Sequence, residues 1–254
     1  MSQLLSKKGS MDIFRHKSSC ETCSISQLCL PNTLSRDEVV RLNTIVNRGT
    51  PIQKGKFLNQ AGDPFKQLNA VSSGSFKSYT LSEDGIINIT GFFFPGELIG
   101  LDAISTGKHT SFVKALETSA VCALPFDKLE DLSGDIRSLR KQLLRIMSKE
   151  IMDDQELLLL LSRKNAAERM AAFLLSLSLR FKQRGFSATS FNLTMTRSDI
   201  GNYLGLAIET VSRLFSQFQK KEIITVTDKL VEIGNLDALM ELAGVNINTD
   251  KTVR

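Results

Sequence analysis

Four cysteines carry the chemistry that this sequence could perform, and three of them lie within ten residues of one another. Cys20, Cys23 and Cys29 follow a Cys-x2-Cys-x5-Cys pattern, whereas Cys122 lies far downstream. Four thiolates form the ligand set of a tetrahedral zinc ion and also of a cubane iron–sulfur cluster. The spacing differs from the paired knuckles of common zinc sites, but spacing alone does not select the metal. An iron–sulfur cluster, a zinc ion and scattered buried thiols therefore all stay open.

Length and composition indicate a globular protein with room for two domains. The 254 residues are 42% hydrophobic and 23% charged, which is ordinary for such proteins. The first 19 residues carry basic side chains but no apolar run, so no signal peptide is expected. The longest hydrophobic run, at 157–161, is too short to span a bilayer. These features predict a cytoplasmic protein without a membrane partner, and in a reducing cytosol clustered cysteines favour metal or redox chemistry over disulfides.

Positive charge is concentrated in the last third of the chain. The net charge is +5, and residues 163–254 hold 13 Lys and Arg against 9 Asp and Glu. An excess of this size is a mild indication that this region meets a polyanion.

Residues 32–137 are predicted to form an antiparallel β-roll, a jelly roll of short strands. Glycines separate short apolar runs from residue 49 to residue 132, and the Asp84-Gly85 pair is typical of a hairpin turn. Cys122 falls in the last of these predicted strands, at 120–123. A helix is expected before the strands, at 34–47, because Ser35 and Glu38 have the spacing of a capping box. The cysteine-rich residues 1–31 form a separate segment.

Residues 138–164 contain no glycine or proline and predict one long helix. Apolar side chains follow the 3-4 spacing of a coiled-coil seam at Leu144, Met147, Ile151, Leu158 and Leu161. The remaining seam position is Asp154. In a homodimer the two Asp154 carboxylates would approach each other, so repulsion and desolvation would weaken the association. The alternative is a helix that packs on its own domain, with Asp154 at a solvated edge.

Residues 165–254 are predicted to form a winged helix-turn-helix. A helix at 165–184 ends at Gly185, and the motif at 197–216 has the spacing of two helices joined at Gly205, with Gly201 where they touch. Thr196 and Asp199 can cap the first of these helices. The inward positions of the motif are apolar, namely Ile200, Leu204, Leu206, Val211 and Leu214. Short runs at 223–226 and 230–233 form the wing.

The second helix of this motif, at 207–220, would lie in the major groove of double-stranded DNA. Arg213 can donate two hydrogen bonds to guanine and Glu209 can accept one from cytosine, while Ser212 can reach a base or a phosphate. Glu209 and Arg213 can also pair within the helix. Arg197 and Thr210 complete the candidate DNA-contacting residues.

These motifs together resemble the Crp/Fnr family of bacterial transcription regulators, and within it the FNR type (fumarate and nitrate reduction regulators). The resemblance covers nearly the whole chain. It is carried by Cys-x2-Cys-Ser-Ile-Ser-Gln-Leu-Cys at 20–29, Leu-Glu-Thr-Ser at 116–119, Asp-Leu-Ser-Gly at 131–134, Leu-Thr-Met-Thr-Arg at 193–197, Asp-Ile-Gly-Asn-Tyr-Leu-Gly-Leu at 199–206 and Glu-Thr-Val-Ser-Arg at 209–213.

The resemblance implies a [4Fe-4S] cluster on the four cysteines, a sensory β-roll, a dimerisation helix that contains Asp154, and DNA reading by Glu209, Ser212 and Arg213. It implies that the intact cluster promotes a homodimer that binds palindromic promoter sites. Oxygen would convert the cluster to [2Fe-2S] and then destroy it, which leaves monomers. It also implies contacts with RNA polymerase from loops near Gly85, Thr118 and Ser187.

Two departures qualify this resemblance. Gly96-Glu97-Leu98 is similar to the phosphate-binding turn of the cyclic-nucleotide branch, but that branch has a later Arg-Ser pair where this chain has Thr110-Ser111. Without the arginine, a cyclic nucleotide is not expected to bind. Ala207 stands where close relatives carry threonine, which removes a potential helix cap worth about 1 kcal/mol.

Two other interpretations remain beside the oxygen sensor. The first is a regulator of the same fold whose cysteines hold zinc or act as redox thiols. The second is an iron–sulfur enzyme with a helical accessory domain. The enzyme is disfavoured because His16 and His109 are the only histidines, neither lies beside a recognisable nucleophile or carboxylate group, and no phosphate-binding Gly-Lys loop is present.

Overall fold

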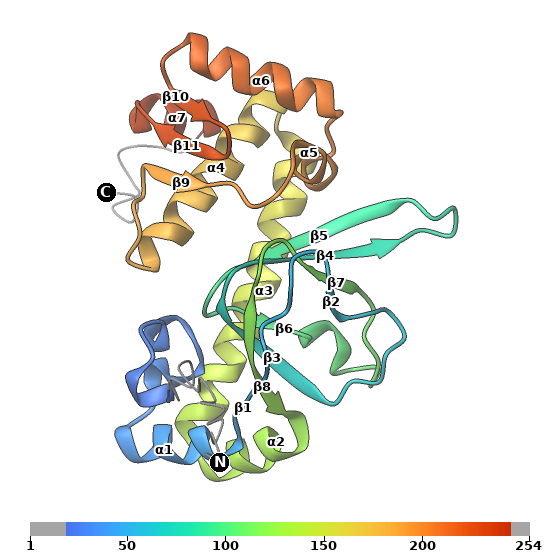
Figure 1. Cartoon of the computed structure of the whole chain (residues 1–254), viewed down its shortest axis with the longest axis vertical. Coiled ribbons are helices and arrows are strands. Elements are labelled where there is room, and N and C mark those ends of the chain that lie inside the picture. The colour runs from blue at the N-terminus through green and yellow to red at the C-terminus, as the bar shows by residue number, and fades with distance from the viewer. Residues whose placement is uncertain (1–18, 245–254) are drawn as a thin grey trace, which may run out of the picture.

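The computed structural model describes residues 19–244 of the chain (Figure 1). The sequence predictions for the N-terminus, including His16, and for the last ten residues lie outside this range. In the figure, one long helix runs between an N-terminal and β-sheet region at the bottom and a helical region at the top. No helix within 19–244 is long and apolar enough to cross a membrane.

The cysteine segment folds as three short turns of 3-10 helix, followed by one α-helix. The turns span Cys20–Thr22, Ser26–Leu28 and Leu30–Thr33, and α1 spans Arg36–Ile45. The predicted capping box is confirmed, because the Ser35 hydroxyl accepts from the Glu38 amide at 3.4 Å and the Glu38 carboxylate accepts from the Ser35 amide at 2.8 Å. This reciprocal cap fixes where α1 begins and so how far the cysteine segment extends.

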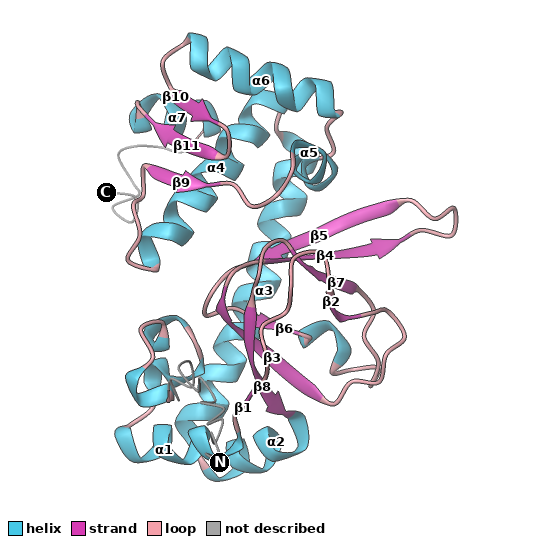
Figure 2. Cartoon of the chain, viewed as in Figure 1, coloured by secondary structure: helices cyan, strands magenta, loops and turns pink. Residues whose placement is uncertain are grey.

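Two four-stranded antiparallel sheets form the predicted β-roll (Figure 2). One sheet has the order β1-β8-β3-β6 and the other β2-β7-β4-β5. The strands are β1 (Asn47–Arg48), β2 (Phe57–Asn59), β3 (Gln67–Ser73), β4 (Phe76–Leu81), β5 (Ile87–Phe93), β6 (Leu98–Ile99), β7 (Phe112–Ala115) and β8 (Ala120–Pro125). Apolar side chains alternate inward along these strands and pack Val71, Phe76, Ile99, Val113 and Ala115 into one core. The predicted Asp84-Gly85 turn joins β4 to β5, with Gly85 at a φ of 76°.

Two helices follow the roll. The first, α2 (Phe126–Asp135), was not predicted, whereas α3 (Arg137–Arg163) agrees with the predicted long helix to within one residue at each end. Leu129 of α2 and Leu139 of α3 are fully buried, in a cluster with Leu30 and Leu42 from the N-terminal segment. The start of α3 is therefore held by the same apolar core that carries the cysteine segment.

The C-terminal region is the predicted winged helix-turn-helix. It comprises α4 (Ala166–Gln183), β9 (Ser190–Asn192), α5 (Arg197–Leu204), α6 (Ile208–Lys220), β10 (Ile224–Thr227), β11 (Leu230–Ile233) and α7 (Leu236–Ala243). The hairpin of β10 and β11 gains β9 as a third strand, in the order β10-β11-β9. Neither β9 nor α7 was predicted.

The turn between α5 and α6 is built as the sequence indicates. Thr196 and Asp199 form a capping box at the start of α5, and Gly205 ends that helix in the left-handed region at φ 63°. A methyl group on Gly201 would lie 2.6 Å from the Leu206 carbonyl oxygen, so only glycine allows this approach. Of the five inward positions, four are buried and Leu206 is half-buried.

The β-roll and the helix-turn-helix pack against each other directly. Lys77 of β4 pairs with Asp199 of α5 at 2.5 Å. The Asn202 side chain donates to the Ile87 carbonyl and accepts from the Ile89 amide, both at 2.6 Å. Since β5 is an edge strand, Asn202 satisfies backbone groups that no neighbouring strand reaches. One apolar cluster runs through both regions.

Candidate metal centre and DNA-binding surface

The four cysteines converge from two parts of the chain. Cys20, Cys23 and Cys29 lie on or beside the 3-10 turns, and Cys122 lies on β8. The register of the first sheet places Cys122 between Arg48 of β1 and Ala70 of β3. All four are half-buried with free thiols. We refer to these four residues as the cysteine site.

A cavity of about 240 Å³ separates these thiols, and all four line it. Its other walls are largely apolar and include Ile25, Leu30, Leu42 and Leu124. Within 19–244, no three His, Cys, Asp or Glu residues lie close enough together to hold one metal ion. Four thiols around one largely apolar cavity fit a group of several atoms, because each thiolate of a cubane cluster binds a different iron.

Burial sets the protonation of the thiols when no metal is bound. It raises the pKa of Cys29 to about 12, and it raises the pKa of Cys20 and of Cys122 against the opposing charge of Arg48. At neutral pH these three groups are therefore thiols, which are poor nucleophiles. A bound metal would reverse this, because a coordinating thiol is deprotonated.

Arg48 and Asn43 hold one edge of the cysteine site. The Arg48 guanidinium donates to the Cys20 sulfur at 3.5 Å and to the Asn43 side-chain oxygen at 2.8 Å. The same oxygen accepts from the Cys20 amide at 3.1 Å. The first cysteine is thus tied to α1 and β1. The sequence prediction missed both residues, because only the pairing of β1 with β8 brings Arg48 to Cys122.

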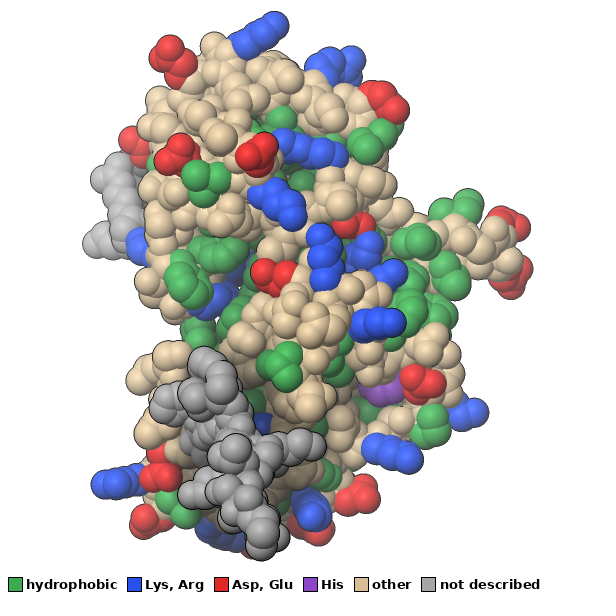
Figure 3. All heavy atoms as spheres, viewed as in Figure 1, with side chains coloured by type: hydrophobic (Ala, Val, Ile, Leu, Met, Phe, Trp, Pro, Cys, Tyr) green, Lys and Arg blue, Asp and Glu red, His purple; other side chains and the backbone are tan. Residues whose placement is uncertain are grey.

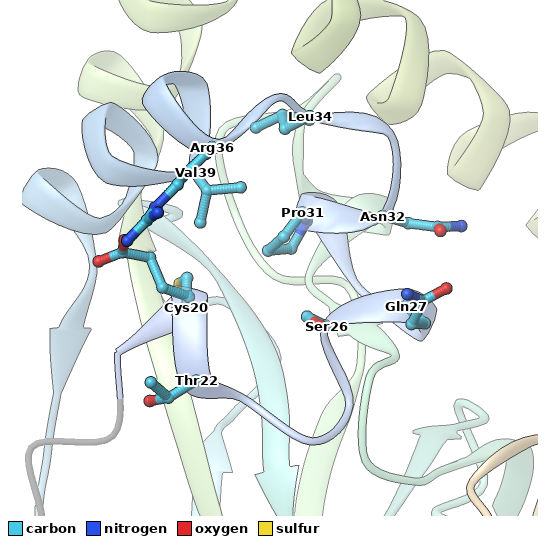
Figure 4. Close-up of a pocket in the computed structure, with 10 residues that line it drawn as sticks. Cys20, Thr22, Ser26, Gln27, Pro31, Asn32, Leu34, Arg36 and Val39 are labelled. Atoms are coloured by element: carbon cyan, nitrogen blue, oxygen red, sulfur yellow. The ribbon is translucent and has the colours of Figure 1, made fainter.

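A second hollow lies between the cysteine turns and the start of α1 (Figure 4). It measures about 470 Å³, and Cys20 lines it together with Pro31, Leu34 and Val39. The Glu21 carboxylate stands 3.8 Å from the Arg36 guanidinium beside it. Of the four cysteines, Cys20 alone lines both this hollow and the 240 Å³ cavity.

The cysteine site also contacts the long helix. Gln142 of α3, which is only 6% exposed, donates to the Cys29 carbonyl at 3.5 Å and accepts from the Thr33 hydroxyl at 3.4 Å. Leu30 packs with Leu139 in the same core. The conformation of residues 29–33 is therefore coupled by contact to the first half of α3.

The predicted seam lies on the outer face of α3. Leu144, Met147, Ile151 and Leu158 are 61%, 37%, 59% and 67% exposed, whereas Leu161 is half-buried. Asp154 is exposed on the same helix, and burial followed by the charge of Asp153 raises its pKa. The apolar stripe is thus uncovered in a single chain, apart from Leu161.

The second helix of the motif, α6, presents the predicted DNA-reading side chains. Glu209, Ser212 and Arg213 are exposed, and Thr210 is half-buried. No ion pair between Glu209 and Arg213 is present in the described part of the chain, and the Ser212 hydroxyl donates to the Ile208 carbonyl at 3.0 Å. Ala207 provides no side-chain cap for α6. The reading face is therefore open, and its first turn has free amides.

Arg197 lies elsewhere in the helix-turn-helix, at the start of α5. Its guanidinium stacks on the Phe215 ring at 3.1 Å, and burial lowers its pKa. One of its terminal nitrogens is buried and has no hydrogen-bond partner among the described residues. Arg197 would have to turn outward to reach a phosphate.

The three loops with predicted polymerase contacts are all at the surface. Gly85 is at the tip of the β4–β5 hairpin, which projects from the molecule with apolar and acidic side chains (Figure 3). Leu81, Ile86 and Ile87 of this hairpin are 47%, 59% and 44% exposed. Thr118 and Ser187 are exposed on other loops.

The residues of the turn that resembles a phosphate-binding turn, and of the later Thr110-Ser111 pair, have partners within the chain. The Asp102 carboxylate accepts from the Thr110 hydroxyl at 2.6 Å and from the Ser111 hydroxyl at 3.1 Å. A carboxylate beside this pair would repel a phosphate. Glu97 of the turn is paired with Arg180 of α4 and with Arg184, the residue that follows α4. Sequence reasoning assigned Glu97 no partner, because the arginines lie more than 80 residues away.

Known proteins match this chain along most of its length. The model of the Crp-like helix-turn-helix domain matches residues 168–242, and that of the cyclic nucleotide-binding domain matches residues 50–135. The fumarate and nitrate reduction regulatory proteins of Yersinia pestis and of Escherichia coli K12 are both 56% identical over 225 residues, which are 89% of this chain and 90% of theirs. The chain belongs to the Crp/Fnr family of transcription regulators.

Solved structures agree with this family. FixK2 from Bradyrhizobium japonicum is 30% identical, with a TM-score of 0.72 over 78% of this chain and 97% of FixK2. A CRP-family regulator from Thermus thermophilus has the same fold, at 16% identity and a TM-score of 0.63 over 78% of this chain and 98% of that protein. The predicted family and fold class are therefore confirmed, and the chain is an FNR-type, DNA-binding transcription regulator.

Proposed function

We propose that this protein is an oxygen-responsive transcription regulator that acts in the cytosol. In this proposal a [4Fe-4S] cluster on Cys20, Cys23, Cys29 and Cys122 promotes a homodimer that binds palindromic DNA sites. The observation that carries the proposal is the apolar cavity lined by all four cysteines of the chain. The identity to fumarate and nitrate reduction regulatory proteins supports it. We assign no enzymatic activity and no cyclic-nucleotide ligand.

A bound [4Fe-4S] cluster would supply an iron–sulfide core that oxygen can oxidise, held to the chain by four iron–thiolate bonds. The chain supplies the connection from these bonds to the dimer helix. Four ligated cysteines would join residues 20–29 to β8, and Gln142 and Leu139 of α3 pack on that segment. When the segment is held in place, the first half of α3 has a fixed platform. When it is released, α3 loses the contacts of Leu30 and the Cys29 carbonyl.

The exposed seam of α3 is suited to a reversible dimer. Four of its apolar residues are uncovered in the single chain, and burying them against a second copy would favour association. The Asp154 carboxylates would oppose that association by like-charge repulsion. Because the seam is weak, its pairing depends on how residues 29–33 hold the first half of α3. The state of the cysteine site can therefore decide whether the dimer forms.

DNA recognition is assigned to the open face of α6. Glu209, Ser212 and Arg213 are exposed on this face, and a dimer would present two such helices to two half-sites. We assign Arg197 to a phosphate contact after it turns outward, and Thr210 to the same face. We assign the loops of Gly85, Thr118 and Ser187 to contacts with RNA polymerase, because the resemblance to FNR-type regulators implies such contacts and all three residues are exposed.

The experiment that tests the proposal replaces each of the four cysteines by serine. Protein purified without oxygen is assayed for iron, zinc, visible absorption and DNA binding. Each variant is expected to lose the visible band and specific DNA binding together, whereas Ser24→Ala, which removes an exposed hydroxyl from the same segment, should retain both. A colourless parent protein that contains zinc would contradict the cluster and leave a regulator with a different signal.

A further inference from the structure

Glu97 lies at the contact between the β-roll and the first helix of the DNA-binding region. Its carboxylate accepts from the Arg180 Nε at 3.0 Å and Nη2 at 2.5 Å, and from the Arg184 Nη2 at 2.6 Å. It also accepts from the Phe94 amide at 2.9 Å. This gives the carboxylate four donors, three of them on two guanidinium groups.

The two arginines bind the β-roll backbone as well. Arg180 donates to the Phe92 carbonyl at 2.5 Å, and Arg184 donates to the Pro95 carbonyl at 2.8 Å. The Arg180 guanidinium also lies 4.5 Å from the centre of the Phe94 ring. Arg180 of α4 and Arg184, the residue after it, therefore join the two regions by hydrogen bonds to backbone as well as by charge.

Solvent has little access to this group. The Arg184 side chain is 3% exposed, and those of Arg180 and Glu97 are 28% and 23% exposed. Burial acts to raise the pKa of Glu97, but the two guanidinium groups outweigh it and hold that pKa below its usual value. By contrast, the Arg41–Asp135 pair is at the surface, where the side chains of Arg41 and Asp135 are 51% and 67% exposed. Removing the charge of Glu97 would leave both guanidinium groups without their carboxylate partner.

Glu150 of α3 and Tyr203 of α5 respond to the charges of this group. Burial and then the negative charge of Glu97 raise the pKa of Glu150 to about 7. Burial raises the pKa of Tyr203 against the opposing charge of Arg180. The Tyr203 ring centre lies 5.2 Å from that of Phe92, whose carbonyl accepts from Arg180, so α5 also packs beside this contact.

A strand ladder connects this group to the cysteine site. Ala70 of β3 pairs with Cys122 on one side and with Leu98 on the other, and Leu98 is the residue after Glu97. The Val71 amide donates to the Glu97 carbonyl at 2.9 Å, and the Gly96 amide donates to the Val71 carbonyl at 2.8 Å. One residue of β3 therefore separates a candidate metal ligand from the turn that holds Glu97.

We propose that Glu97 is a positioning residue, which with Arg180 and Arg184 forms an interdomain anchor that sets the orientation of the helix-turn-helix on the β-roll. The β8–β3–β6 ladder ties this anchor to the cysteine site. The response of the anchor to oxygen rests on the proposed function, whereas its role in DNA binding rests only on the helix-turn-helix. At the turn of residues 96–98, the chain thus makes a contact between its own two domains.

The test compares Glu97→Gln with Glu97→Asp, Arg180→Lys and the surface control Asp135→Asn in the full-length protein purified without oxygen. Hydrogen–deuterium exchange, DNA affinity and visible absorption are measured on each. Glu97→Gln is expected to lose exchange protection in residues 92–97 and 180–184 and to lose DNA affinity about 5-fold to 150-fold, the usual range of coupling between sites. Arg180→Lys should lose part of the exchange protection and part of the DNA affinity, since a lysine cannot donate two parallel hydrogen bonds to the Glu97 carboxylate.

Glu97→Asp, which keeps the carboxylate, should lie between the parent and Glu97→Gln, and Asp135→Asn should match the parent. A variant whose visible absorption equals that of the parent still holds the metal group, so its loss of DNA affinity is due to the loss of the anchor. If Glu97→Gln does not fold, Arg180→Lys carries the same test. Unchanged protection and DNA affinity in Glu97→Gln or Arg180→Lys would overturn the proposal and leave orientation to Lys77–Asp199 and Asn202.

Discussion

Arg213 is the residue to which we assign the reading of a DNA base. It is exposed on α6, and no ion pair with Glu209 holds it among residues 19–244. A guanidinium is the side chain that donates two hydrogen bonds to guanine in the major groove. The free amides at the start of α6, which Ala207 leaves uncapped, are available for a phosphate beside it.

Replacing Arg213 by alanine should weaken binding to the specific site by about 1–3 kcal/mol. Binding to DNA of unrelated sequence should hardly change, since it depends on phosphate contacts. Titration of labelled specific and non-specific duplexes at one salt concentration measures both. An equal loss of affinity for the two duplexes would show that Arg213 contacts the DNA phosphate backbone rather than a base.

At the residue scale, the sequence predicts which cysteines come together better than it predicts their neighbours. All four line one cavity, as their type and number indicate, whereas their binding of a cluster stays a prediction. Arg48 and Asn43 carry no such signal, since arginine and asparagine are common at surfaces. Only the register of β1 with β8 and the fold of α1 bring them to Cys20.

The turn between α5 and α6 is the element that is most sensitive to a small increase in side-chain volume. A methyl group on Gly201 would lie 2.6 Å from the Leu206 carbonyl oxygen and 3.3 Å from the Val211 side chain. The Leu206 contact is with backbone, which cannot move aside as a flexible side chain would. Gly134 in α2 offers a matched control, because a methyl group there meets nothing within 4 Å.

Gly201→Ala is therefore expected to destabilise the helix-turn-helix by about 1–3 kcal/mol, the usual cost of overpacking a core. Gly134→Ala should instead stabilise the protein by up to about 1 kcal/mol, because alanine favours a helix. Urea unfolding followed by circular dichroism measures both changes. Equal stability of the two variants would show that the close approach at Gly201 relaxes at no cost.

The seam of α3 gives a second prediction at the scale of an element. Asp154→Ala removes the like charges that oppose pairing of two helices, so the variant should remain dimeric in air. Glu156→Ala removes an exposed carboxylate of the same helix outside the seam and serves as the control. Sedimentation velocity in air distinguishes the two, and a monomeric Asp154→Ala protein would refute the role of the seam.

Elements with strong local signals were predicted, and those that depend on distant partners were not. The capping boxes of α1 and α5 and the left-handed Gly205 were readable from residue type and spacing. In contrast, β9 is three residues long and exists because it pairs with β11. Likewise, α2 lacks a side-chain cap and follows β8 directly, so its start carries no signal in the sequence.

At the scale of the whole molecule, two sets of contacts lead from the cysteine site to distant parts of the protein. Gln142 and Leu30 link it to α3, and Ala70 links Cys122 to the turn of Glu97 and so to α4. The first set leads to the proposed dimer seam and the second to the proposed interdomain anchor. The sequence predicted the cysteine site and the seam, but neither set of contacts nor the anchor, because contacts between distant segments leave no local pattern.

The central claim is that oxygen acts on the cysteine site and that DNA binding follows. It is tested most directly by titrating protein purified without oxygen with air-saturated buffer, while visible absorption and binding to a labelled specific duplex are recorded together. The account predicts a broad visible band that bleaches as oxygen is added, with DNA binding lost in proportion. DNA binding that persists after the band has gone, or a protein with no visible band at all, would contradict it.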